Sequence, residues 1–291
     1  MVTEQGIRGF RAWHEHADAQ KPDCLQRFTR LCVDACSRGW HEANGGNLSY
    51  RLDEADAAEL ESLLHPEDTW HALKRRAPEL AGERFLMSAS GAYLSNVAYD
   101  APHCCGVIEL DAAGAAWRCC WGFEGEAHPS SELETHLAAY ATALRAGDDA
   151  NRVVYHAHCP HVIALSTLIE PDTRTWARVL WRCMTEGIIV FPQGVGVVEW
   201  MVPGSPELAL ATCDLMARHT ACVWTQHGVM ARAAGFDEAF GIIETIEKSA
   251  GIYLQARAAS GGAEPRYLVS DEQLRAICAR YDLQPNEDFL E

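Results

Sequence analysis

The sequence lacks any long apolar run. Among its 291 residues there is no stretch of about 18 consecutive apolar residues, so we expect no membrane-spanning helix. The first 11 residues contain no apolar core of the kind that a secretory signal peptide carries. Without these export features, the sequence predicts a cytoplasmic protein.

Positive charge is scarce. The chain has 24 Lys and Arg residues against 41 Asp and Glu residues, which gives a formal net charge of −17. This balance argues against binding to nucleic acid or to an anionic membrane surface. If the substrate is an anion such as a phosphate, backbone N–H groups and a metal ion must hold it locally.

The Cys-x-x-Cys motif is absent, although the chain contains 12 cysteines. Adjacent pairs at Cys104–Cys105 and Cys119–Cys120 lie in strand-like runs. We interpret the cysteines as reduced, buried, small apolar residues of a cytoplasmic protein. The alternative is a zinc site with thiolate ligands.

A histidine pair at the end of one predicted strand is the main chemical feature. His156 and His158 follow the apolar residues Val153 and Val154, and alternate residues of a strand share a face. Two imidazoles on one face can bind a single metal ion. With 13 histidines, about 0.6 His-x-His pairs are expected by chance, and we interpret the second pair, His14 and His16, as solvated surface.

A catalytic zinc site commonly has three protein ligands and one open position. His227 lies at the end of another predicted strand, and the following Gly228 permits a close approach of the backbone. Glu132 lies one predicted helix upstream of the His156 pair. A carboxylate there can act as a base beside the metal, although an ordinary helix N-terminal glutamate is the simpler alternative.

Two small-residue turns are candidate phosphate sites. The residues Asn44-Gly45-Gly46-Asn47 precede a predicted strand, and Ser88-Ala89-Ser90-Gly91 follow another. Asn and Gly tolerate a positive φ, so such turns can direct consecutive N–H groups at an anion. The alternative is that both are ordinary turns.

The remaining pattern predicts a mixed, largely antiparallel sheet that is covered by helices, because several strands are joined by short turns. Residues 1–24 are predicted to be a polar extension, residues 25–291 one domain, and residues 53–83 an irregular acidic insertion. A capping box of Ser131 and Glu134 is predicted to open a helix that ends near Arg145. The predicted helices are residues 25–38, 160–168, 172–186, 205–219, 236–258 and 271–281. The predicted strands are residues 48–52, 84–87, 106–110, 115–121, 152–158, 188–191, 195–200 and 221–226.

In this order, the turn at 44–47, Ser90-Gly91, Ser131-Glu132, His156-Ala157-His158 and His227-Gly228 resemble the class II sugar-phosphate aldolase/epimerase superfamily. The stretch Trp200-Met201-Val202-Pro203-Gly204 looks most like the bacterial rhamnulose-1-phosphate aldolases. The resemblance covers about residues 25–281. It implies a three-layer α/β/α fold, cleavage of a sugar phosphate, and a homotetramer.

The resemblance also implies a role for each site residue. His156, His158 and His227 would bind one Zn²⁺ per subunit, and Glu132 would move a proton at C3 of a dihydroxyacetone phosphate unit. Glu186 would aid the aldehyde half of the reaction. The residues that would hold phosphate and neighbouring oxygens are Asn44, Gly45, Asn47, Ser90, Gly91, Ser130 and Ser131.

Three alternatives remain at this point. An enzyme of the same superfamily could act on L-fuculose 1-phosphate or epimerise ribulose phosphate. The fold could instead be a non-catalytic module like the adducin head, which is expected to lack the histidine ligands. A zinc hydrolase is the third, but it gives the two small-residue turns no clear role.

Overall fold

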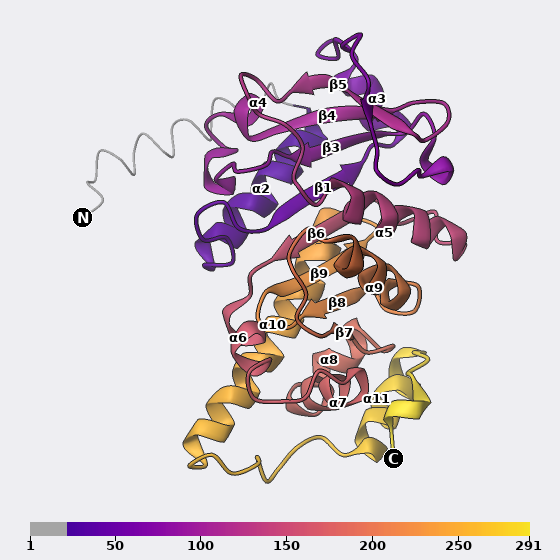
Figure 1. Ribbon diagram of the computed structural model, residues 1–291. Helices are drawn as coiled ribbons and strands as arrows, with labels where there is room; N and C mark the ends of the chain where they lie inside the picture. The colour runs from indigo at the N-terminus through magenta and orange to yellow at the C-terminus, as the bar shows by residue number, and fades with distance from the viewer. Residues whose placement is uncertain (1–21) are drawn as a thin grey trace, which may run out of the picture.

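One nine-stranded sheet runs through the computed structural model, which describes residues 22–291 (Figure 1). Its strand order is β2-β5-β4-β3-β1-β6-β9-β8-β7. Neighbouring strands are antiparallel except β7 and β8, which are parallel. The prediction of a mixed, largely antiparallel sheet is therefore confirmed. The strands are β1 (Asn47–Arg51), β2 (His71–Ala72), β3 (Arg84–Ser88), β4 (Cys105–Leu110), β5 (Ala116–Gly122), β6 (Val153–Ala157), β7 (Gly196–Val198), β8 (Ala221–Trp224) and β9 (Gly228–Ala233).

Helices cover both faces of this sheet. The α-helices are α2 (Asp23–Ser37), α3 (Glu54–Leu60), α4 (Ala101–Cys104), α5 (Leu133–Arg145), α6 (Pro160–Leu165), α7 (Thr173–Cys183), α8 (Thr185–Val190), α9 (Pro206–Met216), α10 (Phe236–Ala259) and α11 (Asp271–Tyr281). Short 3₁₀ turns are η2 (Pro78–Leu80), η3 (Leu94–Asn96) and η4 (Glu287–Phe289). Helices α2 and α10 contact each other, as do α5 and α9.

The core has two parts, one on each face of the sheet. In β6, Tyr155 belongs to the cluster that α2 and α10 cover, and its neighbour Val154 belongs to the cluster that α5 and α9 cover. This alternation follows from strand geometry, which points successive side chains to opposite faces. The helix–sheet–helix arrangement confirms the predicted three-layer α/β/α fold.

Several helices begin or end at the capping residues that the sequence predicts. Ser205 accepts a hydrogen bond from the backbone N–H of Leu208 and so caps α9. Gly39 follows α2 in the left-handed region, with φ +74°, as expected of a glycine after a helix C-terminus. Helix α2 begins at Asp23, two residues before the predicted start of the domain. The rest of the predicted extension, with His14 and His16, lies outside the described residues except for Pro22.

Three elements differ from the predictions. Residues 53–83 are not irregular, because they contain α3, the edge strand β2 and η2. The predicted strand at 188–191 is wrong, since residues up to Val190 belong to α8, which packs against α7, α10 and α11. Tertiary packing there overrides the β preference of Ile188, Ile189 and Val190. Strand β9 was not predicted, because all six of its residues are buried and show no polar alternation.

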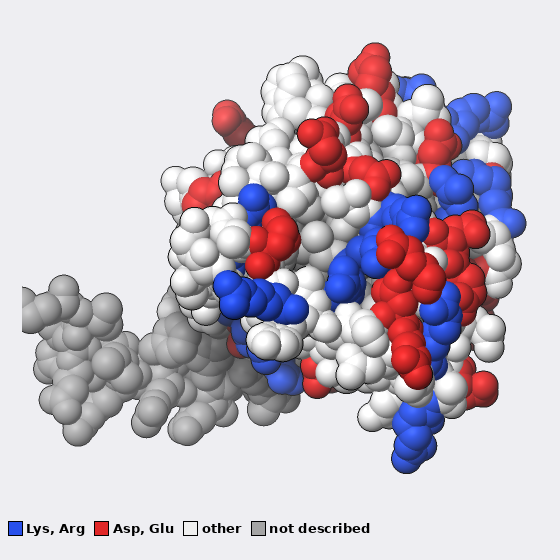
Figure 2. Space-filling view, turned by 90° about the horizontal axis from the view of Figure 1, so that it is seen from below, with Lys and Arg blue, Asp and Glu red and all other residues white. Residues whose placement is uncertain are grey.

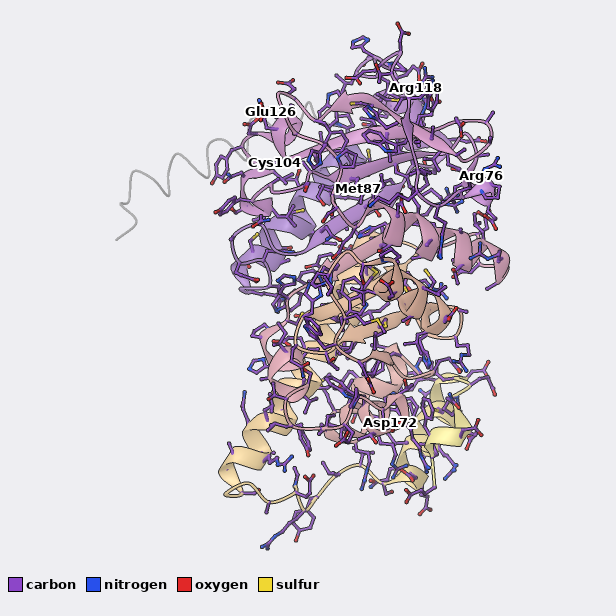
Figure 3. All side chains as sticks on the ribbon, in the orientation of Figure 1. Arg76, Met87, Cys104, Arg118, Glu126 and Asp172 are labelled. Carbon is purple, nitrogen blue, oxygen red and sulfur yellow. The ribbon has the colours of Figure 1, made fainter. Side chains whose placement is uncertain are left out.

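The cysteines are free thiols, and ten of the 12 are buried. Cys104, labelled in Figure 3, is the last residue of α4 rather than part of a strand as predicted. The burial of ten cysteines agrees with the prediction that they are buried apolar residues, and their reduced state stays a prediction.

On the face seen in Figure 2, Lys and Arg side chains gather toward the upper right, with acidic side chains beside them. Within residues 22–291, no helix is both long and apolar enough to cross a membrane. Basic and acidic side chains are interspersed on that face (Figure 2). This mixture fits the excess of acidic residues in the sequence.

Candidate metal centre and active site

Three histidines from two neighbouring strand ends meet at one point. His156 lies in β6, His158 follows β6, and His227 lies in the turn between β8 and β9. Strands β6 and β9 pair directly, with Ala157 opposite Val229. One ring nitrogen from each of the three histidines lies within 4.8 Å of the others, and the ring centroids are 4.8 to 5.0 Å apart. The structure thus brings together all three residues of the predicted metal site.

The backbone around His227 explains its direction. Gln226 adopts a left-handed conformation with φ +54°, and its side-chain amide donates to the carbonyl oxygen of Ser166. The next residue after His227, Gly228, lies directly against the carbonyl group of Ala157. A Cβ atom on Gly228 would overlap that carbonyl, so only glycine lets the two strands approach this closely.

Hydrogen bonds from Nδ1 leave Nε2 of His156 and of His158 free for the cluster. His156 donates from Nδ1 to the carbonyl oxygen of Val229 (3.1 Å), which leaves the lone pair on Nε2. His158 donates from Nδ1 to the carboxylate of Glu42 (2.6 Å). Such partners commonly orient histidines that bind a metal.

Two nitrogens of the cluster are buried without any partner in the described chain. They are Nε2 of His156 and Nδ1 of His227. A buried polar atom without a partner is costly, and a cation bound at Nε2 of His156 would remove that cost there. Burial, followed by the neighbouring histidines, lowers the pKa of His156 well below its usual range. Burial also lowers the pKa of His227 to about 4, so both rings are neutral near pH 7 and their lone pairs are available. The residues therefore fit a metal ion.

Cysteine does not take part in this cluster. Cys159 follows His158 directly but packs in the apolar cluster under α2 and α10. Burial, with a smaller contribution from Glu247, raises the pKa of its thiol well above the usual value, so the sulfur stays protonated. Within residues 22–291, the group of possible metal ligands consists of the three histidines. His161 points elsewhere, because its Nδ1 bonds to Glu247 of α10.

Glu132 occupies the N-cap position of α5 rather than its first turn. The helix begins at Leu133, and no side chain caps it, so the predicted capping box of Ser131 and Glu134 is wrong. The carboxylate of Glu132 is buried and accepts a hydrogen bond from Nδ2 of Asn47 (3.0 Å). Burial raises the pKa of Glu132, while the bond from Asn47 and the nearby His158 oppose that rise. A carboxyl with a raised pKa suits proton transfer.

The predicted phosphate turns come together beside Glu132. Strand β1 pairs with β3, and the backbone N–H of Leu48 donates to Oγ of Ser88 (3.1 Å). The segment before α5 joins them, since the N–H of Ser130 donates to the carbonyl oxygen of Ser88 (3.0 Å). Gly46 and Gly91 have φ values of +73° and +72°. Asn44, Gly91 and Ser131 are exposed, so a small anion can reach this corner from solvent.

One predicted site residue, Asn47, has contacts that the sequence did not suggest. The side chain of Asn47 is bonded to Glu132 and His136, so it is not simply directed at solvent. Glu186 is exposed in the first turn of α8, and Gly187 after it is a buried helix residue. No hydrogen bond or ion pair within residues 22–291 joins Glu186 to the histidine cluster. Its role stays a prediction.

Sequence reasoning missed three residues of the site. His41 donates from Nδ1 to the carbonyl oxygen of Gly45 (2.9 Å) and bonds through Nε2 to Tyr155, which fixes the 44–47 turn. Glu42 orients His158, and His136 contacts Asn47. His136 lies four residues after Glu132 on α5, a spacing that places both on one side of the helix and could have singled it out.

Comparison with known proteins identifies the family. A family model described as "Class II Aldolase and Adducin N-terminal domain" matches residues 26–254. The chain belongs to the class II aldolase family. It is 37% identical over 267 residues to rhamnulose-1-phosphate aldolase of Enterobacter sp. (strain 638), covering 92% of this chain and 96% of that protein. It is also 37% identical over 261 residues to the enzyme of that name from Escherichia coli O157:H7, covering 90% and 94%.

Solved structures agree with this assignment. A sugar-phosphate aldolase from Thermotoga maritima superposes with a TM-score of 0.68 at 27% identity, covering 84% of this chain and 97% of that one. An L-fuculose 1-phosphate aldolase superposes with a TM-score of 0.59 at 21% identity, covering 90% and 98%, which supports the shared fold. The class II aldolase family includes the adducin head, but this chain retains the three histidines and Glu132. It is an enzyme of the lyase class.

Proposed function

We propose that this class II aldolase reversibly cleaves L-rhamnulose 1-phosphate into dihydroxyacetone phosphate and L-lactaldehyde, with one Zn²⁺ per subunit. The observation that carries the proposal is the identity of 37% over 92% of the chain to a relative named for that activity, together with the histidine cluster and Glu132. The L-fuculose 1-phosphate alternative has weaker support, because that likeness is at 21% identity and concerns the fold.

The protein would hold the metal through His156, His158 and His227, whose lone pairs face one point. Three imidazoles form a donor set that suits zinc, and a catalytic zinc ion commonly keeps one position open for substrate. A zinc ion there would supply a Lewis acid that withdraws electron density from the substrate's carbonyl. The Glu42 carboxylate and the Val229 carbonyl orient the rings of His158 and His156, which would hold the metal ion.

Glu132 would carry the proton at C3. In cleavage, the C3–C4 bond breaks, its electron pair stays with the C3 fragment as an enediolate, and C4 becomes the aldehyde carbon as the 4-hydroxyl gives its proton to water. The Glu132 carboxylate takes up one proton from water. Glu132 then returns one proton to C3, which gives dihydroxyacetone phosphate. In the reverse direction the Glu132 carboxylate removes that proton. The turns at 44–47 and 88–91, with Ser130 and Ser131, would hold the phosphate beside it.

The test is retro-aldol activity on L-rhamnulose 1-phosphate, with metal content assayed on the same sample. We expect cleavage that a chelator abolishes and Zn²⁺ restores. L-Fuculose 1-phosphate and ribulose phosphate serve as comparison substrates. Faster turnover of either one would show that the substrate is that sugar phosphate instead of L-rhamnulose 1-phosphate. Bound metal with no turnover of any sugar phosphate would contradict the proposal.

We also propose that the enzyme is cytoplasmic and that it is a homotetramer, and the family resemblance implies the tetramer. Multi-angle light scattering of the purified protein checks the assembly, and the expected mass is four times that of the 32.1 kDa chain. A monomer with full activity would contradict the tetramer without affecting the assigned reaction.

A further inference from the structure

A chain of buried side chains leads away from the Glu132 carboxylate into the protein. Asn47 donates from Nδ2 to Oε2 of Glu132, and His136 contacts Oδ1 of Asn47 through Nε2. Nδ1 of His136 lies 2.7 Å from Oγ of Ser49, and that hydroxyl lies 2.9 Å from the phenol oxygen of Tyr140. Each of these five side chains is at most 7% exposed.

The donor and acceptor of each hydrogen bond from Glu132 to Ser49 can be assigned by starting at the Glu132 carboxylate. An ionised carboxylate only accepts, so the amide nitrogen of Asn47 faces Glu132 and its oxygen faces His136. The proton of His136 is therefore on Nε2, and Nδ1 accepts from the hydroxyl of Ser49. Burial lowers the pKa of His136 to about 3, so the ring keeps this single neutral form near pH 7.

The chain ends inside the protein. The phenol oxygen of Tyr140 accepts from the N–H of Val154 (3.1 Å), and its single proton has the carbonyl oxygens of Ser49 (2.9 Å) and Arg152 (3.1 Å) and the Ser49 hydroxyl within reach. These are backbone groups of β1 and β6 and the residue before β6, and they cannot pass a proton on to solvent. The arrangement therefore suits holding a group in place rather than conducting protons.

Only one carboxylate oxygen of Glu132 takes part in this hydrogen-bonded row of side chains. Asn47 bonds Oε2, whereas no hydrogen bond within the described part of the protein reaches Oε1. Oε1 is thus the oxygen available to a substrate. A carboxylate held by one oxygen keeps the other at a constant position, and a displacement of about 1 Å can cost roughly 10²-fold in rate.

We propose that His136 is a positioning residue: through the amide of Asn47 it fixes the Glu132 carboxylate so that Oε1 faces the proton at C3. The inference rests on the proposed role of Glu132 as the acid/base of the aldolase reaction. His136 does not itself touch the substrate. Without its Nε2–H, the Asn47 amide loses the partner that keeps its nitrogen turned toward Glu132.

The first experiment compares His136→Phe with His136→Gln. Phenylalanine fills the space without a donor, whereas the glutamine amide can donate to Asn47. We expect His136→Phe to lower kcat per bound metal by about 10- to 100-fold, with a KM within about twofold of wild type. His136→Gln should recover most of that loss. The matched control is His219→Phe, since His219 is also buried but stacks on Phe289, away from the side chains that lead from Glu132 to Tyr140.

A double-mutant cycle separates positioning from general damage. If His136 acts through Asn47, then Asn47→Leu combined with His136→Phe should have the same kcat as Asn47→Leu alone. Losses that multiply in the double variant would overturn the proposal. So would a His136→Phe protein whose lower activity is explained fully by lost metal or by unfolding.

Two further readouts keep this test distinct from the test of the proposed function. Exchange of the C3 proton of dihydroxyacetone phosphate with D₂O depends on the base but not on the aldehyde, so it applies even if L-rhamnulose 1-phosphate is the wrong substrate. Infrared difference spectra of the protein against Glu132→Gln follow the Glu132 carboxyl band with no substrate present. We expect His136→Phe to shift that band and His136→Gln to restore it. An unchanged band in His136→Phe would refute the positioning role whatever the activity.

Discussion

Gly228 lies against the carbonyl group of Ala157, and no side chain fits between them. This contact joins the two strand ends that carry the metal ligands, since Ala157 separates His156 from His158 and Gly228 follows His227 directly. The spacing of β6 and β9 thus determines the geometry of the metal centre. A side chain at residue 228 must move one strand end relative to the other.

Gly228→Ala should therefore lose metal. The added methyl group would also lie 3.1 Å from Cε1 of His156, so the ring nitrogens would no longer converge. We expect a loss of at least about 10-fold in Zn²⁺ affinity, measured by competition with a chromophoric chelator. The control is Gly235→Ala, because a Cβ at Gly235 meets nothing within 4 Å. Metal affinity equal to wild type in Gly228→Ala would show that the strand spacing is not limiting.

Glu132→Gln should abolish proton transfer while the metal centre stays intact. The glutamine amide is isosteric but cannot take up a proton, so we expect kcat to fall by about 10² to 10⁴-fold. Metal content should remain at the wild-type level, because Glu132 is not one of the three ligands. Glu134→Gln is the matched control on the same helix, where the carboxylate accepts from the N–H of Lys74. Retained C3 exchange in Glu132→Gln would exclude this residue as the acid/base.

The same substitution should change stability in a pH-dependent way. Burial raises the pKa of Glu132 in the folded protein, so folding favours the protonated form. Any stability that this group provides is present below its unfolded pKa and is lost as the pH rises through the folded pKa. Glu132→Gln should therefore raise the free energy of unfolding at pH 8 relative to wild type and lose that advantage toward pH 4. Urea unfolding of metal-free protein at both pH values measures this, and a gain independent of pH would contradict it.

Glu42→Gln should weaken metal binding without abolishing it. The Glu42 carboxylate accepts the Nδ1 proton of His158 at 2.6 Å, and such a partner orients the ligand and raises its basicity. Because the Glu42 side chain is 68% exposed, we expect a loss near the lower end of the usual range, about 10-fold in Zn²⁺ affinity. Glu126→Gln, at the exposed site labelled in Figure 3, is the control. If Glu42→Gln binds Zn²⁺ as tightly as the control does, the hydrogen bond between Glu42 and His158 has no role in metal binding.

Local sequence signals were sufficient where an element has its own caps or periodicity. Helix α11 spans residues 271–281 as predicted, and its N-terminus has a capping box of Ser270 and Gln273. Local sequence signals were insufficient where packing against other elements determines the secondary structure. Ile188 to Val190 have a strand-like composition, yet they form α8 because α7, α10 and α11 surround them. Ser131 and Glu134 have the right spacing for a cap, but Glu132 takes the N-cap position and bonds to Asn47 instead.

The sequence alone determined which residues can do the chemistry, because residue type and order fix the available groups: three histidines, one glutamate near the start of a helix and two small-residue turns. Only the tertiary structure decided how these groups are held. The partners of the histidines and of Glu132 come from distant segments, with Glu42 116 residues from His158 and Asn47 85 residues from Glu132. No local pattern encodes such contacts, since they exist only once β1, β6 and α5 pack together and exclude water from the polar groups between them.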